Sequence, residues 1–393
     1  MTTTRLHSRD MRAGYDPERL ARARVLVVGV GALGQNILQT LALSGVGNFL
    51  LVDFDRFEDH NATRSPFFPA DGWGARYEGR KAPLVAMRAL AASTATDPAI
   101  YYSTETVQQV GDTGIRWADV VVSAVDSVPA RGWLAERSRL HATPMVEGGF
   151  SGSEFNFSSF SAEAGTVCYR CFNAERASST SCTRYALELE REAIVPSIQT
   201  TAAVLAGYMT EQVMGIVHED WAVYGTRSYG DVRRTRFETA VLPVHPRCPG
   251  EHVPLPDAGE LPGGLATVGD LMAVLRDRYR EGWLLLSEPV VLAQTCTVCL
   301  RMCQVRSLES SWMLDPVCVD CGGPWPLGDA REPDIATLVD FTLTPDDRLA
   351  ATPLHDVGVR PGGSVVVEPL DTPQFLLHTP GTLPETCPRY LVP

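Results

Sequence analysis

The chain has 393 residues, 45% of them hydrophobic, and a formal net charge of −13 at pH 7. This length exceeds one ordinary hydrophobic core, so it predicts two domains. The acidic balance argues against a nucleic-acid partner, because a phosphate backbone is bound by clustered Lys and Arg. The N-terminal residues lack the apolar core of a signal peptide, and no later stretch reaches the roughly 18 apolar residues of a membrane span. We therefore expect a cytoplasmic protein that does not bind membranes.

The first part of the chain alternates between strand and helix patterns. Residues 24–28 and 49–52 are short apolar runs, and the helical pattern of 32–43 lies between them. A second helix and two more buried strands are expected over 82–92, 119–125 and 144–147. This alternation predicts an α/β fold with a doubly wound, mostly parallel sheet of the Rossmann type.

A change of composition marks the expected domain boundary. Residues 243–264 are rich in proline and glycine, which predicts a linker or covering loop. We expect a first domain over 1–255 and a smaller second domain over 256–393. A helix that begins after Thr267 and a strand over 364–367 are expected in the second domain.

Glycines follow the first expected strand and open the first expected helix. Gly29, Gly31 and Gly34 would let the backbone approach phosphates, which the free amides of the helix N-terminus attract. Asp53 ends the next strand, where a carboxylate accepts hydrogen bonds from ribose hydroxyls. Up to this point an NAD-dependent dehydrogenase and an ATP-dependent enzyme both fit, and the segment after Asp53 decides between them.

That segment, residues 53–64, reads Asp-Phe-Asp-Arg-Phe-Glu-Asp-His-Asn-Ala-Thr-Arg. With residues 79–82 and 119–126 it resembles, in order, the motifs of the ThiF/MoeB-type family, which includes ubiquitin-activating enzymes and sulfur-carrier adenylyltransferases. The resemblance covers roughly residues 5–252 and leaves the last third of the chain unexplained. It implies a homodimer that uses ATP and Mg²⁺ to adenylate the C-terminal carboxylate of a ubiquitin-like or sulfur-carrier protein.

The reaction that the resemblance implies needs cations, because a carboxylate that attacks the α-phosphorus of ATP brings two anions together. Arg64 and Lys81 are the natural candidates. The resemblance makes Asp126 a magnesium ligand, with Asp55 assisting, and places Asn61 against phosphate or its metal.

The family also has an arginine near the N-terminus that reaches the partner's site in the dimer. Arg9 is the nearest counterpart here, and Arg5 is the second. The chain departs from the family pattern after Arg64, where Ser65 replaces the usual glutamine and the distance to Lys81 is longer.

Ten cysteines in a long chain without a secretion signal are not expected to form disulfides. Cys168 and Cys171 resemble the first half of the structural zinc site in this family. Cys248 and His252 would complete a Cys3His site that suits tetrahedral Zn²⁺. His245 is the competing fourth ligand.

A second pair of Cys-x-x-Cys motifs has the spacing of a zinc ribbon. Cys296 and Cys299 precede Cys318 and Cys321, and we expect these four thiolates to bind a second structural Zn²⁺. Cys303 is an alternative ligand for one position.

Cys182 belongs to neither zinc group and lies near the position where relatives carry a thiol that attacks the acyl-adenylate. Ser181 would cap a helix over 183–193, and the first turn of that helix would stabilise a Cys182 thiolate. An ordinary loop cysteine is the alternative interpretation.

Four functions remain open on the sequence. The first is a modifier-activating enzyme that passes its substrate through Cys182, as a thioester, to a conjugating enzyme, in a bacterial conjugation system of antiviral defence. Residues 353–367 are similar to the closing part of a ubiquitin-like β-grasp fold and mildly favour this function, although a generic turn and strand explains them equally. The others are a sulfur-carrier adenylyltransferase, a peptide-adenylating enzyme and a zinc-containing scaffold without catalysis.

Overall fold

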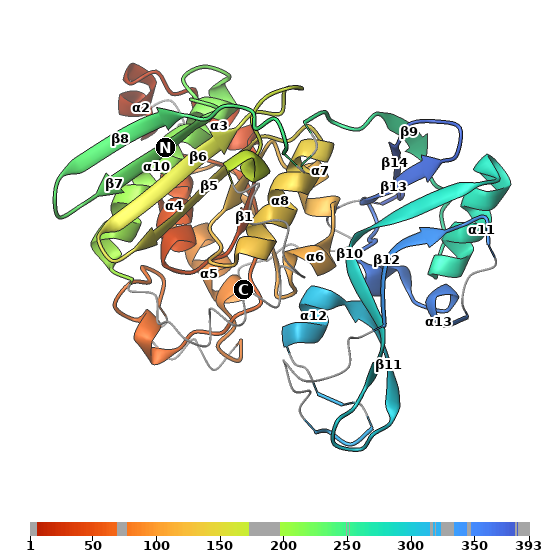
Figure 1. The fold of residues 1–393 in the computed structure, drawn as a ribbon. Helices are drawn as coiled ribbons and strands as arrows, with labels where there is room; N and C mark the ends of the chain where they lie inside the picture. The colour runs from red at the N-terminus through yellow and green to blue at the C-terminus, as the bar shows by residue number, and fades with distance from the viewer. Residues whose placement is uncertain are drawn as a thin grey trace.

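The computed structural model describes residues 6–68, 77–172, 197–248, 250, 252–314, 317–318, 320–323, 334–343, 347–381 and 383. Two β-sheets organise these residues, one formed by strands up to residue 241 and one by strands from residue 257 onward (Figure 1). None of the helices in the described ranges is long and apolar enough to cross a membrane.

The first sheet has eight strands in the order β3-β2-β1-β4-β5-β6-β7-β8. They are β1 (Arg24–Val28), β2 (Asn48–Val52), β3 (Ala99–Ser103), β4 (Val120–Ser123), β5 (Met145–Ser151), β6 (Glu154–Phe160), β7 (Thr226–Asp231) and β8 (Arg236–Val241). The first five strands are parallel and β6 to β8 extend the sheet in antiparallel pairs. The predicted α/β fold class is confirmed. Strand order reverses between β1 and β4, and such a switch point is where sheets of this kind bind ligands.

Helices cover both faces of this sheet (Figure 1). They are α2 (Ser8–Arg12), α3 (Pro17–Arg22), α4 (Ala32–Leu43), α5 (Lys81–Ala92), α6 (Val107–Val110), α7 (Thr113–Trp117), α8 (Val128–Leu140) and α10 (Gln199–His218), with the 3-10 turns η1 (Asp59–Asn61) and η3 (Tyr169–Phe172). In β1, Val25 and Val27 pack with α4, α5 and α10, whereas Leu26 and Val28 pack with α6, α7 and α8. Burial on both faces explains why these strands are continuous apolar runs in the sequence.

The second sheet has six strands, in the order β11-β10-β13-β14-β9 with β12 also paired to β10. They are β9 (Asp257–Glu260), β10 (Gly282–Thr295), β11 (Met302–Leu308), β12 (Asp334–Asp340), β13 (Ser364–Pro369) and β14 (Phe375–His378). The helical elements are α11 (Val268–Tyr279), α12 (Glu309–Leu314), α13 (Asp347–Ala350) and the 3-10 turn η5 (Leu354–Val357). Thr267 caps α11 through a reciprocal capping box with Asp270, as the sequence predicts.

Two features of the second part differ from a simple linker followed by a separate unit. Residues 257–260, which fall in the expected linker, form β9 and pair in parallel with β14, because the edge of β14 needs a hydrogen-bonding partner. Beyond β14 the chain returns to the first sheet, where Leu383 is 3% exposed and joins the core that contains Leu26.

Candidate functional site

A glycine-dependent turn joins β1 to α4. Gly29 has a φ of +85°, and a Cβ built on it would lie 2.7 Å from the Ala124 carbonyl oxygen. A Cβ on Gly34 would lie 1.9 Å from the carbonyl oxygen of Gly29. Both contacts are with backbone atoms that a side chain cannot displace, so this turn requires glycine at both positions. Gly31 precedes α4 in an extended conformation, and the N-terminus of α4 therefore opens on the turn.

Beside this turn lies a pocket of about 390 Å³ at the carboxyl ends of the parallel strands. Its walls come from the glycine turn, the ends of β2, β3 and β4, and the start of α5. The predicted nucleotide-site residues on its walls are Gly29, Gly31, Asp53, Asp55, Asn61, Arg64, Lys81 and Asp126. Gly34 lies behind the turn and keeps it closely packed. The fold thus brings together residues that span almost a hundred positions of sequence.

Asp53 is 9% exposed and lies at the end of β2. Its carboxylate accepts hydrogen bonds from the backbone amides of Val30, at 2.7 Å, and Asp55, at 2.8 Å. Burial, reinforced by the nearby Asp55 carboxylate, raises the pKa of Asp53 to about 6, while Lys81 and the two amides act against the shift. The carboxylate is therefore ionised at neutral pH, in the form that accepts hydrogen bonds from hydroxyl groups.

The charged side chains of the pocket are held by local contacts. Lys81 begins α5, is 12% exposed, and places its Nζ 2.8 Å from Oδ2 of Asp55. Asn61 accepts a hydrogen bond from the Glu58 amide within η1, and Arg64 donates to the His60 carbonyl oxygen. A lysine, an arginine and the N-terminus of α4 give the pocket positive elements that suit an anionic ligand.

A buried ion-pair network supports the wall of the pocket beside Asp126. Glu147, on β5, is fully buried and its carboxylate contacts Arg131 at 2.6 Å and Arg227 at 3.0 Å. Arg131 also donates to the Val125 carbonyl oxygen, next to Asp126, and lines the pocket. These three residues are absent from the sequence prediction, because they come from α8, β5 and β7 and share no local motif.

Three further predicted residues are not among the pocket residues that the structure describes. Arg9 is exposed on α2 and is not among the lining residues that the structure describes. Arg5 and Cys182 lie outside the described residues, as does the segment 183–193 with its expected cap. The catalytic assignments of Arg9 and Cys182 thus stay predictions.

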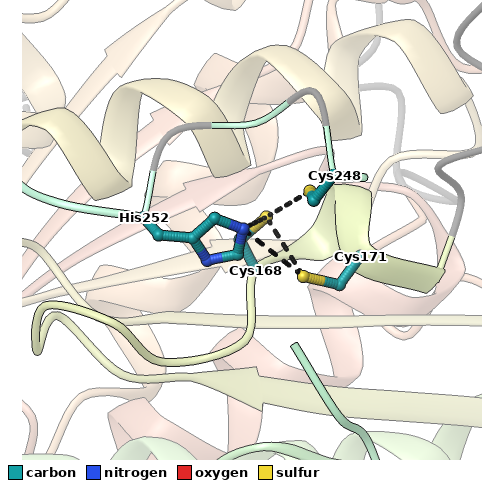
Figure 2. Close-up of side chains that lie close together, drawn as sticks. All are labelled: Cys168, Cys171, Cys248 and His252. Carbon is teal, nitrogen blue, oxygen red and sulfur yellow. Dashed lines mark hydrogen bonds between the residues drawn. The ribbon is translucent and has the colours of Figure 1, made fainter. Parts of the chain in front are cut away.

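The first predicted zinc site assembles around η3 (Figure 2). The ligand atoms of Cys168, Cys171, Cys248 and His252 all lie within 4.8 Å of one another. The Sγ of Cys168 is 3.9 Å from that of Cys171, and Nε2 of His252 is 3.6 Å from the Cys171 Sγ. A tetrahedron with Zn–S bonds of about 2.3 Å separates its ligand atoms by roughly 3.8 Å, so the group fits zinc.

The neighbours of the histidines distinguish the two alternatives for the fourth ligand. Nδ1 of His252 donates to the Thr166 carbonyl oxygen at 2.8 Å, which leaves Nε2 directed at the three thiols. His245 instead accepts a hydrogen bond from the Arg247 amide and meets the cluster through its own backbone amide. The geometry favours His252.

The second predicted zinc site lies where β10 turns toward β11. The ligand atoms of Cys296, Cys299, Cys318 and Cys321 also lie within 4.8 Å of one another. The Sγ of Cys303 is 3.3 Å from that of Cys318, so this fifth thiol borders the group. Four converging thiols in a small, loop-rich region fit a structural zinc ion.

Comparison with known proteins identifies the family. The ThiF family model matches residues 7–249, which include the whole pocket and all eight strands of the first sheet. The chain belongs to the ThiF family. Residues beyond 249, including the whole second sheet, lie outside the family match.

Several proteins and structures are similar to this ThiF protein. It is 29% identical to the SAMP-activating enzyme E1 of Haloferax volcanii, over 59% of this chain and 81% of the relative. It is 28% identical to the molybdopterin-synthase adenylyltransferase of Escherichia coli, over 50% of this chain and 79% of the relative. A crystal structure of E. coli MccB with succinimide has a TM-score of 0.52 over 63% of this chain and 74% of that chain, at 17% identity. That last likeness is one of fold.

Proposed function

We propose that this ThiF protein uses ATP to adenylate the C-terminal carboxylate of a ubiquitin-like or sulfur-carrier protein, with release of pyrophosphate. The observation that carries the proposal is the pocket at the strand-order switch, which gathers the phosphate-binding turn, a ribose-binding carboxylate and two cations. The names of the relatives, an E1-type activating enzyme and a molybdopterin-synthase adenylyltransferase, support the same chemistry.

Each pocket residue takes a role that follows from its charge and place. The amides of the glycine turn and the N-terminus of α4 bind phosphate oxygens, and Asp53 accepts from the ribose. Arg64 and Lys81 neutralise the charge that grows on the α-phosphate as the substrate carboxylate attacks. Asp126 and Asp55 offer the carboxylate oxygens that would hold Mg²⁺, and a bound Mg²⁺ would neutralise part of the phosphate charge.

The adenylate has two possible fates, and we propose the first. In a modifier-activating enzyme, the Cys182 thiolate attacks the acyl carbon, AMP leaves, and the resulting thioester passes to a conjugating enzyme. In a sulfur-carrier adenylyltransferase, a sulfur donor converts the adenylate to a thiocarboxylate. The alternative of a peptide-adenylating enzyme concerns the substrate and not the fate of the adenylate. The cytoplasmic location and a role in antiviral defence stay predictions.

The proposed assembly is a homodimer with two structural zinc ions per chain. Support for a partner surface comes from β8, an edge strand whose six residues are all exposed. Phe237 on this strand is 45% exposed and stacks on Tyr208, which is 40% exposed. An edge strand with exposed aromatic residues invites pairing with another chain. In the proposed dimer, Arg9 completes the partner's nucleotide pocket.

ATP–pyrophosphate exchange tests the proposal. Exchange should appear only when a ubiquitin-like or sulfur-carrier protein with a free C-terminal carboxylate is added, and Asp126→Ala should abolish it. Glu18→Ala, which removes an exposed carboxylate on α3, is the control and should retain full exchange. Cys182→Ala should retain exchange but lose a thiol-sensitive covalent adduct. If the chain binds ATP but no carrier protein supports exchange, the proposal is wrong, and a peptide-adenylating enzyme or a noncatalytic scaffold remains.

A further inference from the structure

The second part of the chain packs directly on a segment that borders the nucleotide pocket. This segment runs from the end of β3 through α6 to α7, and its neighbour is the loop between η5 and β13. A Cβ built on Gly111 would lie 2.2 Å from the Gly358 carbonyl oxygen, so the two backbones are in contact. Arg116 donates to the carbonyl oxygens of Gly362 and Gly363 at 2.7 and 2.8 Å. The contact is therefore close and specific.

Arg360 makes the contact nearest to the pocket. Its Nη2 donates to Oε1 of Glu105 at 2.7 Å, and its Nε donates to the Gln109 carbonyl oxygen at 2.9 Å. Its own carbonyl oxygen accepts from the Gly363 amide, which holds the loop closed. The Arg360 side chain is 20% exposed. One guanidinium group thus holds both the Glu105 side chain, before α6, and the Gln109 backbone, within α6.

Glu105 and the three residues that follow it line the nucleotide pocket. The Glu105 amide donates to Oγ of Ser103, and the Ser103 carbonyl oxygen accepts from the amide of Asp53, the proposed ribose-binding residue. The glycine turn follows β1, and β2 separates β1 from β3 in the sheet. A nucleotide with its phosphates at the turn and its ribose at Asp53 therefore extends its base toward the segment from Glu105 to Gln108.

We propose that Arg360 is a positioning residue that fixes the base-binding wall of the nucleotide pocket through Glu105 and Gln109. The inference rests on the proposed placement of ATP in this pocket, and it makes the second part of the chain a component of the nucleotide site. Loss of Arg360 frees the Glu105 side chain and the start of α6, while the glycine turn, Arg64 and Lys81 stay in place.

The test compares ATP with inorganic pyrophosphate, which has no base, by calorimetric titration of the full chain in the presence of Mg²⁺. Arg360→Ala should weaken ATP binding about five- to tenfold, the loss expected for two partly exposed charge-assisted hydrogen bonds. Pyrophosphate binding should stay within about twofold of wild type, because the phosphate contacts are intact. Arg280→Ala, an exposed arginine of the same part of the chain, is the matched control and should change neither.

Further variants keep the inference falsifiable if Arg360→Ala is poorly folded. The charge swap Glu105→Arg with Arg360→Glu should recover part of the ATP binding that either single change loses. It restores the pair between the two side chains but not the hydrogen bond to the Gln109 carbonyl oxygen, which a carboxylate cannot donate. In exchange assays, Arg360→Ala should raise KM for ATP and leave kcat near the wild-type value. Unchanged ATP binding, or an equal loss of ATP and pyrophosphate binding, would overturn the inference. Failure of the proposed function looks different, since wild type would then bind ATP without exchange.

Discussion

Asp112 joins the two sheets through one buried carboxylate. It is 3% exposed and accepts hydrogen bonds from Nε of Arg137 at 2.7 Å and from Oγ of Ser364 at 2.6 Å, and Nε2 of His141 lies 2.8 Å away. Arg137 makes a second contact through Nη2. Arg137 and His141 belong to the first part of the chain, whereas Ser364 begins β13. Asp112→Ala removes every one of these contacts.

The expected cost of Asp112→Ala follows from this burial. The Arg137 guanidinium, 5% exposed, would be left without a counter-charge, and breaking such a buried pair costs about 3–5 kcal/mol. Burial alone would raise the pKa of Asp112, but Arg137 and His141 hold it well below its ordinary value of 3.8. A carboxyl group whose pKa is lowered in the native state stabilises the fold at every pH above its ordinary pKa. This stabilisation is lost only as the pH falls through the native pKa. At pH 7 the wild type has this stabilisation in full, so Asp112→Ala should show its full cost there.

Urea unfolding at pH 7 measures this cost. Trp133 donates from Nε1 to the Ser287 carbonyl oxygen across the same contact between the two parts, so tryptophan fluorescence and circular dichroism should both report the change. Glu18→Ala is the control, because its pair with Arg22 is more than 70% exposed and is worth about 1 kcal/mol or less. Stability of Asp112→Ala within about 1 kcal/mol of wild type would refute the assigned role of the buried pair.

Three further outcomes are expected. Gly34→Ala should abolish ATP binding and lower the melting temperature, because its Cβ would lie 1.9 Å from a backbone oxygen; Gly132→Ala in α8, where nothing lies within 4 Å, should be tolerated. ATP affinity should fall as pH drops below about 6, where Asp53 takes up a proton, and Asp53→Asn should remove this pH dependence. Elemental analysis should find two zinc ions per chain, and Cys248→Ser should lower that content while leaving the second group occupied.

The sequence predicts the parallel strands and the glycine turn because their signals are local. Strands buried on both faces are apolar throughout, and a turn with positive φ requires glycine. The antiparallel strands β6 to β8 carry weaker signals. All six residues of β8 are exposed, so pairing rather than composition makes it a strand. Similarly, β9 forms within a proline- and glycine-rich stretch because β14 offers it a partner.

The same distinction separates the predicted and missed parts of the pocket. Asp53, Asp55, Asn61 and Arg64 fall within one short motif, and the sequence places them together. The pair between Arg360 and Glu105 joins residues 255 positions apart, and no spacing rule relates them. Contacts of this kind depend on how the second sheet packs against the first.

Adenylation of a protein carboxylate is tested most directly by the intact mass of the carrier protein after incubation with this chain, ATP and Mg²⁺. Cys182→Ala forms the adenylate but cannot consume it, so it should add the mass of one adenylyl group to a ubiquitin-like or sulfur-carrier protein. Wild type should give this adduct or a thioester between the carrier and the chain, whereas Asp126→Ala should leave the carrier unmodified. The proposed function would be contradicted if the chain binds ATP but leaves every such carrier protein unmodified.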